Sequence, residues 1–339
     1  MRVGEDACEG PEWDALVRRS EGWTQFHLFG WKRIIEAAFG HECLYLSAAD
    51  DAGLAGVLPL VRVKSRLFGH YLVSMPFVNY GGPLGCSAAV QALVQAAVRR
   101  ADREGVRLLE LRSRRTLEVP LQVSHRKVTV VRDLPPGDPE QLWKELRAKV
   151  RSQVRRPRKE GIEVRFGPDQ VAPFCSVYRR HMRDLGTPAQ GLALFELIQE
   201  TFPDDVWFGC AYDGSRPVAA GCGFVWDGEF EMTWASALRA YSRVAPNMLL
   251  YWRFMERAAQ RGLRLFNFGR CTPGGGTHRF KRQWGSRDEP LWWYYRASGR
   301  RASTPSPDEA AYAWGPRLWR RLPLPVANIL GPRIVRYIP

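Results

Sequence analysis

The chain has 339 residues, with 50 Lys and Arg against 35 Asp and Glu and a net charge of +15 at pH 7. This length exceeds what one hydrophobic core usually supports, so two domains are expected. The apolar share of 45% excludes a disordered chain, and the positive charge favours a polyanionic partner such as nucleic acid, anionic membrane or a phosphate-bearing small molecule.

The first part of the chain is expected to mix helices and strands. A helical segment over residues 12–38 is followed by two strands of a hairpin, Leu44–Ala49 and Leu54–Val63. Residues Ala88–Arg103 carry an apolar stripe at helical spacing, and a strand is predicted at Val106–Leu111.

The second part repeats this order of elements. It opens with a basic helix that Pro157 should end or kink, and a second hairpin is predicted from Trp207–Tyr212 and Pro217–Trp226. A helix over Asn247–Arg261, with Asn247 as its cap, leads into a buried strand that ends in Gly269.

A duplicated segment indicates how the domains are organised. The stretch Arg100–Arg112 aligns with Arg257–Gly269, with a glycine in each where a helix should end. One such long pair favours two similar domains over a solenoid. We therefore predict a first domain at 1–132, a linker at 133–140, a second domain with the active site at 141–300, and a Pro-rich basic tail at 301–339.

The segment after Gly269 is the strongest candidate site. A glycine-rich loop, Gly274–Gly276, is followed by Phe280, Lys281 and Trp284. A lysine among aromatic side chains can offer its charge to a phosphate or to a developing oxyanion. The alternative is a solvated lysine on a turn whose aromatic residues belong to the core. The loop does not open a helix in the manner of a dinucleotide fingerprint, and a flexible lid is the preferred interpretation.

The cysteines and histidines argue against two other kinds of site. Seven cysteines without paired spacing favour free thiols in a reducing compartment. The N-terminus contains acids and no apolar core, unlike a secretion signal, so a cytoplasmic protein is predicted. Six scattered histidines and no Cys-x-x-Cys predict no metal site.

Positive charge is concentrated between Lys144 and Arg165, where nine Lys and Arg face three Glu. We predict a nucleic-acid-binding surface there, limited to phosphate contacts because aromatic residues for base stacking are absent. A solvated helix face is the alternative. The predicted binding residues are Arg147, Lys149, Arg151, Arg155 and Arg156.

The order of several short motifs resembles one family of bacterial proteins. The motifs include Ser65–Gly69, Ser74–Phe77, Tyr80–Leu84, Phe266–Arg270 and Phe280–Gly285. Together they are similar to the FemAB-related proteins associated with the exosortase/PEP-CTERM system, which are relatives of the Fem peptidyltransferases and of BioF2-like acetyltransferase domains. The resemblance covers nearly the whole chain.

The resemblance implies a fold and an activity. The fold is an α/β (α+β) tandem of two GNAT-like domains, with mixed sheets flanked by helices. The activity is transfer of an acyl or aminoacyl group to an amine on a cell-envelope or exopolysaccharide-related acceptor. The Phe-Lys motif of Fem enzymes matches Phe280 and Lys281, which become the catalytic candidates, with no bound cofactor.

Further substrate-binding residues are predicted around this motif. Arg270 and Tyr251 could hold a phosphate or the acceptor, and Asn247 would lie at a helix start, where anions bind well. The complete set is Tyr80, Gly81, Gly82, Thr187, Asn247, Tyr251, Asn267, Arg270 and Trp284. Asn267 departs from the resemblance, because an Asp is expected at that position; activity could then be weakened or redirected.

The donor and the cellular partners stay open at this point. A charged tRNA would use the basic helix, whereas an acyl-CoA donor is disfavoured because residues 239–247 contain no glycine for a pyrophosphate loop. The alternatives are an acetyl-CoA-type enzyme acting on a small amine and a non-catalytic basic protein at the membrane surface. In either case, the C-terminal tail is a candidate for peripheral contact with the anionic inner membrane.

Overall fold

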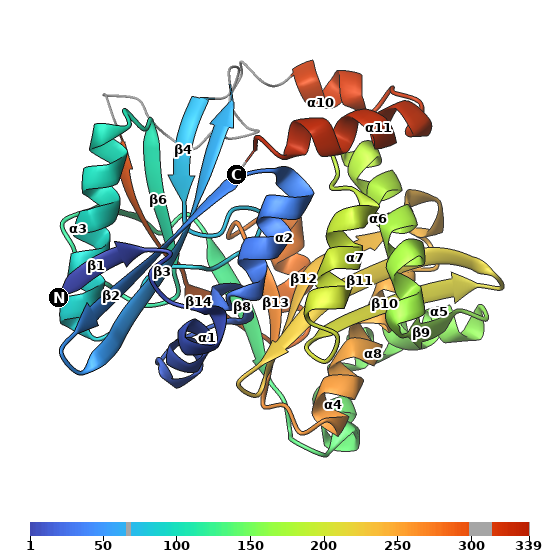
Figure 1. The fold of residues 1–339 in the computed structure, drawn as a ribbon. Helices are drawn as coiled ribbons and strands as arrows, with labels where there is room; N and C mark the ends of the chain where they lie inside the picture. Colours follow the sequence, from blue (N-terminus) through green and yellow to red (C-terminus); the bar gives the residue numbers. More distant parts are fainter. Residues whose placement is uncertain (66–68, 298–313, 339) are drawn as a thin grey trace. The chain divides into compact units, whose positions relative to one another are not determined.

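The computed structural model describes residues 1–65, 69–297 and 314–338, which form two compact units (Figure 1). Unit 1 comprises residues 1–127, 290–309 and 336–339, and unit 2 comprises residues 128–289 and 310–335. Residues 66–68 of the Ser65–Gly69 motif and residues 301–313 of the predicted tail lie outside the described residues. Of the helices that are described, none has both the length and the apolar character needed to cross a bilayer.

Unit 1 is built on a sheet with the strand order β1-β2-β3-β4-β6-β15-β7, and β5 pairs with β3. Its elements are β1 (Arg2–Glu5), α1 (Gly10–Arg19), η1 (Gln25–His27), α2 (Gly30–Phe39), β2 (Glu42–Asp50), β3 (Gly53–Ser65), β4 (Gly69–Val73), β5 (Leu84–Gly85), α3 (Ser87–Arg103), β6 (Leu108–Ser113), β7 (Gln122–Ser124) and β15 (Trp292–Ala297). Helix α3 buries its apolar stripe against this sheet, as Leu93, Val94 and Ala97 demonstrate.

Unit 2 is built on a seven-stranded sheet with the order β14-β8-β13-β12-β11-β10-β9. Its strands are β8 (Val128–Asp133), β9 (Glu163–Phe166), β10 (Val206–Asp213), β11 (Arg216–Trp226), β12 (Glu229–Ala237), β13 (Leu265–Cys271) and β14 (Arg287–Pro290). Its helices are α4 (Pro139–Glu145), α5 (Ala148–Lys159), η2 (Pro168–Gln170), α6 (Val171–Leu185), α7 (Leu192–Thr201), η3 (Arg239–Tyr241), α8 (Pro246–Gln260), α9 (Gly276–Arg282), α10 (Trp314–Trp319) and α11 (Leu324–Val335).

The two sheets follow the same plan. Each has a run of antiparallel strands, then one parallel pair, then a further antiparallel neighbour. The parallel pairs are β4 with β6 and β12 with β13, and the crossovers contain α3 and α8. Gly105 and Gly262 follow these helices with positive φ angles of 60° and 76°, a conformation that favours glycine. The predicted duplication and its mixed sheets are confirmed.

The strand that follows the parallel pair in each sheet comes from a distant part of the chain. Strand β8 pairs with β13 in the sheet of unit 2, and β15 pairs with β6 in the sheet of unit 1. This arrangement differs from the predicted division, which assigned residues 128–132 to the first domain and the residues of β15 to the second. The predicted linker is also anchored in unit 2, because the Gly137 N–H donates to the Ala259 carbonyl at 2.8 Å.

Two predicted helices are each divided. The segment 12–38 forms α1 and α2, separated by a turn in which Gly22 has a φ of 77°. The basic helix is interrupted at Leu146, which has extended backbone angles between α4 and α5. Pro157 lies within α5, two residues before its end, so the main break comes eleven residues earlier than the sequence predicts.

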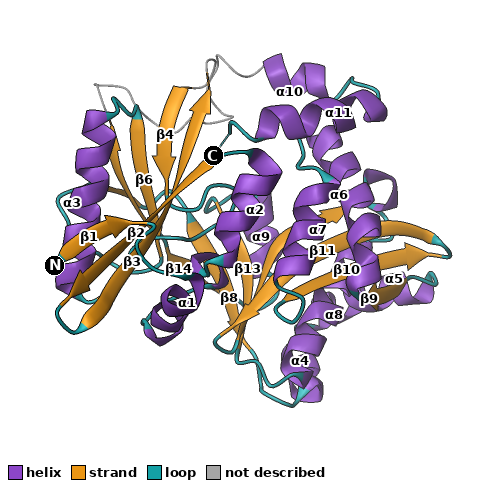
Figure 2. Ribbon diagram, viewed as in Figure 1, coloured by secondary structure: helices purple, strands orange, loops and turns teal. Residues whose placement is uncertain are grey.

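Helices cover both faces of the sheet in unit 2 (Figure 2). Trp207 points to the core that α8 fills, whereas the next residue, Phe208, contacts Phe174 of α6 and Phe195 of α7 on the other face. Successive strand residues point to opposite faces, so the apolar run of β10 serves two cores.

Candidate active site in unit 2

Strands β12 and β13 separate soon after they begin. Their parallel pairing comprises Glu229 with Leu265, Phe230 with Phe266 and Glu231 with Asn267. Beyond these pairs β12 continues beside β11 as far as Ala237, while β13 continues beside β8. The backbone of β13 after Asn267 therefore needs other hydrogen-bonding partners on the side that β12 leaves.

Lys281 supplies one set of those partners. Its Nζ donates to the carbonyl of Gly269 at 2.8 Å and to that of Arg270 at 3.0 Å, and the side chain is only 5% exposed. These bonds use two of the three donors of the ammonium. The solvated lysine considered as an alternative is excluded, because Lys281 is fixed against the end of β13.

Burial lowers the pKa of Lys281 to about 8, although the nearby Cys271 and Glu231 act in the opposite direction. At neutral pH most molecules therefore carry the charged form. A cation held by backbone carbonyls needs little reorganisation before it can stabilise a negative charge.

A bulge at Gly269 shapes the end of β13. The register with β8 shifts between Asn267 and Arg270, and Gly269 has a φ of 74°. The Gly269 N–H donates to Asn267 Oδ1 at 2.7 Å. The bulge turns the Gly269 and Arg270 carbonyls to the ammonium, and the positive φ explains the glycine after Phe268.

Asn267 lies in a buried polar network. Its Nδ2 donates to Glu229 Oε1 at 2.7 Å and to Glu231 Oε2 at 3.3 Å, while its Oδ1 accepts from Thr129 Oγ1 at 2.8 Å. All four side chains are at most 7% exposed. An amide can donate to carboxylates and accept from Thr129 at once, whereas a charged Asp here would face two carboxylates.

Sequence reasoning missed Glu229, Glu231 and Thr129. The alternation Glu229-Phe230-Glu231-Met232 was a usable signal, because two acids inside an otherwise apolar strand are uncommon unless they are paired. Phe230 and Met232 enter the core on the α8 side, so both glutamates share the opposite face with Asn267.

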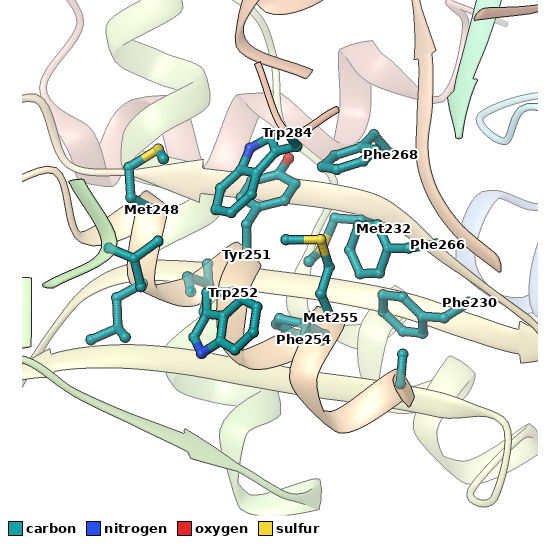
Figure 3. Close-up of a cluster of buried hydrophobic side chains, with 14 of the residues drawn as sticks. Phe230, Met232, Met248, Tyr251, Trp252, Phe254, Met255, Phe266, Phe268 and Trp284 are labelled. Carbon is teal, nitrogen blue, oxygen red and sulfur yellow. The ribbon is translucent and has the colours of Figure 1, made fainter. Parts of the chain in front are cut away.

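Aromatic side chains pack around Tyr251, and Figure 3 shows Phe268 and Trp284 among them. Tyr251 of α8 lies with its ring centroid 5.0 Å from that of Phe280, 5.7 Å from Phe268 and 6.3 Å from Trp284. Tyr251 and Trp284 are buried, and burial raises the pKa of Tyr251. In this structure Tyr251, Phe280 and Trp284 therefore form the packing that positions Lys281.

The first turn of α8 lies beside α9. Gln283 Nε2 lies 3.7 Å from Met248 Sδ, and Asn247 is the next residue towards the N-terminus. Asn247 is not the helix cap that the sequence predicts: α8 begins at Pro246, and the capping position is Ala245 with a φ of 59°. Pro suits the first helical position because it needs no hydrogen-bonded N–H there. The prediction that the Gly274–Gly276 loop does not open a helix also needs correction, since Gly276 is the first residue of α9.

The other predicted substrate residues are dispersed. The Arg270 carbonyl accepts from Lys281, and Thr187 is exposed just after α6. In unit 1, the N–H groups of Gly81 and Gly82 donate to the Arg112 carbonyl, and Tyr80 is buried. A cavity of about 220 Å³ adjoins this turn, with Tyr80, Gly82 and Arg114 in its wall.

The basic residues of α5 form a surface of unpaired charge. Its apolar face, Val150 and Val154, is buried, and most of the cations are exposed. The nearby Glu145 and Glu163 pair instead with Arg132 and Arg165. Within the described part of the chain none of the predicted binding residues, Arg147, Lys149, Arg151, Arg155 and Arg156, forms an ion pair.

An aromatic residue does lie on this surface, contrary to the sequence interpretation. The guanidinium of Arg155 lies 5.3 Å from the ring centroid of the half-buried Trp143. Trp143 also contacts Trp252 edge-on at 4.7 Å, and both line a cavity of about 370 Å³ with Lys144 and Arg158. The residue was missed because the break at Leu146 places Trp143 on a separate helix, α4, from which its ring contacts Arg155 of α5.

The comparisons with known proteins agree with this architecture. Residues 144–282 match the family model described as an acetyltransferase (GNAT) domain. FemX, a solved structure, is 14% identical with a TM-score of 0.63, over 87% of this chain and 97% of that chain. A tandem GNAT protein from the clavulanic acid biosynthesis pathway is 10% identical with a TM-score of 0.55, over 89% and 99%. The chain has a duplicated GNAT-like fold.

A third solved structure has the same overall organisation. L-PGS from Bacillus licheniformis is 11% identical with a TM-score of 0.57, over 97% of each chain. The search of curated proteins finds no match. At these identities the structural similarities establish the fold, and the activity has to be argued from the site.

Proposed function

We propose that this protein is a Fem-like N-acyltransferase that transfers an aminoacyl or acyl group to an amine on a cell-envelope or exopolysaccharide-related acceptor. The observation that carries the proposal is the buried Lys281 ammonium where β12 and β13 separate. The GNAT domain match over residues 144–282 supports the reaction class, and the exosortase setting implied by the resemblance is a prediction that none of the comparisons tests.

The proposed reaction requires little covalent chemistry from the protein. A neutral acceptor amine attacks the carbonyl carbon of the donor ester, a C–N bond forms and the C–O bond breaks. The amine loses a proton and the departing hydroxyl group gains one. Lys281 stabilises the negative charge that develops on the carbonyl oxygen or lies on an adjacent phosphate, and Phe280 helps to hold its helix.

A charged tRNA is the donor that we favour. The unpaired cations of α5 suit a phosphate backbone, and Trp143 adds an aromatic surface beside them. This donor requires a cytoplasmic enzyme. The alternative is an acyl-CoA, whose phosphates would bind near Asn247 at the start of α8; the preceding loop, residues 238–245, contains no glycine that could form a phosphate cradle.

We assign the acceptor to the remaining predicted residues. Arg270 and Thr187 in unit 2 are candidates for contacts with a peptide or glycan amine. The Tyr80–Gly82 turn in unit 1 is a separate candidate surface for the acceptor. The cavity beside this turn is lined by cations and acids alike, among them Arg114, Glu21 and Glu118, so it would offer polar contacts of both signs to an acceptor.

The donor is tested first by ligand-dependent stability. Thermal unfolding is measured with CoA, acetyl-CoA, total tRNA and buffer alone. A ligand at about one hundred times its Kd stabilises the native state by roughly 2.7 kcal/mol. A shift with tRNA alone supports the favoured donor. A shift with acetyl-CoA changes the donor to a thioester, and the protein is then a GNAT-type enzyme acting on an amine.

The activity is tested with radiolabelled aminoacyl-tRNA and an extract of envelope precursors. We expect protein-dependent transfer of label to an amide that resists mild base, which cleaves the ester. The transfer is lost in Lys281→Met and kept in Arg279→Met, which changes an exposed cation of the same helix. Equal transfer by both variants, with intact folding, would exclude Lys281 from the reaction. The absence of protein-dependent transfer in the wild type would instead favour the non-catalytic binding protein.

A further inference from the structure

The large apolar side chains that unit 2 exposes lie at the end of α6 and on the neighbouring helices α10 and α11 (Figure 1). In the described part of this unit they are Leu185 at the end of α6, Leu318 of α10, and Val326, Ile329 and Leu330 of α11, with exposed fractions of 51%, 56%, 40%, 60% and 37%. A soluble protein rarely collects such residues on one surface without a use for them. We call these five residues the α11 face.

Helix α11 is fixed on its opposite side. Ala327, Gly331 and Val335 recur every four residues and are buried. Gly331 packs so closely that an added Cβ would lie 2.9 Å from the Ala189 carbonyl oxygen, and Arg179 Nη2 donates to the Asn328 carbonyl at 2.5 Å. The outer stripe of Val326, Ile329 and Leu330 is therefore held outward by a packed helix and is not a frayed end.

The α11 face is surrounded by positive charge. Arg317, Arg320, Arg321 and Arg333 are exposed. Arg333 follows Ile329 by four residues and Leu330 by three, so it lies on the same side of α11 as these two apolar residues. Residues 310–339 contain no Asp or Glu. A partner of this face must accept both apolar side chains and several cations.

We propose that the α11 face binds the surface of an anionic lipid bilayer. The apolar stripe would enter the boundary between headgroups and acyl chains, while the arginines contact lipid phosphates. A second copy of the chain would bring like charges together, which disfavours self-association. The α5 surface differs in kind, because no large apolar side chain between residues 139 and 165 is exposed to such an extent.

Membrane binding is expected to be reversible and to need both the apolar stripe of α11 and the surrounding arginines. Each basic residue near an anionic surface strengthens partitioning roughly fivefold. One helix without a lipid anchor gives a modest apolar contribution, so removal of either the stripe or two arginines should be clearly measurable. Lipid binding by the α11 face is independent of the proposed transfer reaction.

The test is co-sedimentation of the 339-residue protein with vesicles. Vesicles of phosphatidylcholine alone are compared with vesicles containing about one third phosphatidylglycerol. One variant carries Ile329→Ser and Leu330→Ser, a second carries Arg320→Gln and Arg321→Gln, and the matched control carries Arg155→Gln and Arg156→Gln on α5. All positions are exposed, and circular dichroism confirms folding.

We expect binding to the anionic vesicles alone, weakened by salt. The Ile329/Leu330 variant should lose at least tenfold in affinity, the Arg320/Arg321 variant roughly 25-fold, and the α5 control less than threefold. Failure of the wild type to bind anionic vesicles overturns the proposal. A loss of vesicle affinity confined to the α5 control also overturns it, because the binding would then depend on the cations of α5. Concentration-dependent dimerisation that the Ile329/Leu330 variant abolishes would identify a second copy as the partner instead.

Discussion

Asn267 Nδ2 donates to Glu229 Oε1 at 2.7 Å across the parallel strands β12 and β13, and both side chains are buried. The same amide group also reaches Glu231. Asn267 stands where the family resemblance leads us to expect an Asp, yet it suits its surroundings, because one amide nitrogen can donate to two carboxylates. Its role in unit 2 is to hold the strands together next to the point at which they separate.

Replacement of Asn267 by Asp should destabilise the protein by about 3 kcal/mol at pH 7.5, because it buries a carboxylate against two others. The new carboxyl would have a raised pKa in the folded state, so the native state binds the extra proton more tightly than the unfolded state. The deficit relative to wild type should shrink as the pH falls to 5.5. Urea unfolding at both pH values measures it.

Thr129→Val is the control for this substitution, because it removes one hydrogen bond and should cost about 1 kcal/mol with little dependence on pH. An Asn267→Asp variant as stable as wild type at pH 7.5 would contradict the network as the reason for the amide.

Transfer activity should fall as the pH rises through about 8. The lowered pKa of Lys281 means that the ammonium is lost above this value, whereas an ordinary lysine would stay charged. The Lys281→Arg variant keeps its charge, so its residual activity should continue to higher pH. Initial rates across pH 6.5–9.5 provide the test. A rate that increases above pH 8 only when Lys281 is present would contradict this prediction. The neutral form of the Lys281 side chain would then be the active one.

Gly269→Ala should cost about 1–3 kcal/mol, because the φ of 74° in the bulge is strained for alanine. Gly276→Ala is the matched control: an added Cβ there has nothing within 4 Å, and a side chain at the start of α9 should leave stability unchanged or raise it by up to about 1 kcal/mol. Thermal and urea unfolding measure both variants. Equal effects would show that the bulge does not require glycine.

The α5 surface should determine how tRNA affinity depends on salt. Removing the charges of Arg155 and Arg156 together should lower the slope of log K against log salt by about 1.4–1.8, since each phosphate contact contributes about 0.7–0.9. Filter binding of total tRNA between 50 and 300 mM salt tests this. The control carries Arg99→Gln and Arg103→Gln on the exposed side of α3 and should leave the slope unchanged.

Trp143→Ala should weaken the same binding with no change in slope, because stacking releases no counterions. A reduced slope in the Arg99/Arg103 control, or an unchanged one in the α5 variant, would place the nucleic acid elsewhere or exclude it.

Local signals in the sequence determined much of the fold. Gly105 and Gly262 ended their helices where predicted, because the conformation after a helix depends on the residue itself and its nearest neighbours. Apolar periodicity located α3 and α8 to within one residue at each end. The Phe280-Lys281 motif identified the position of the buried cation, but not the helix α9 on which it lies. Each of these features depends on residues within a few positions of one another.

Long-range contacts decided the rest. The pairing of β8 with β13, rather than with its chain neighbours in unit 1, brings Thr129 to Asn267 across 138 positions of sequence. The register of β12 and β13 places Glu231 opposite Asn267, and their early separation leaves the carbonyls that Lys281 occupies. Short-range composition by itself determined most of the helices and strands and the position of the Phe280-Lys281 motif. Only tertiary structure could bury a lysine, an asparagine and two glutamates together, because the free energy of each buried polar group depends on partners distant in the chain.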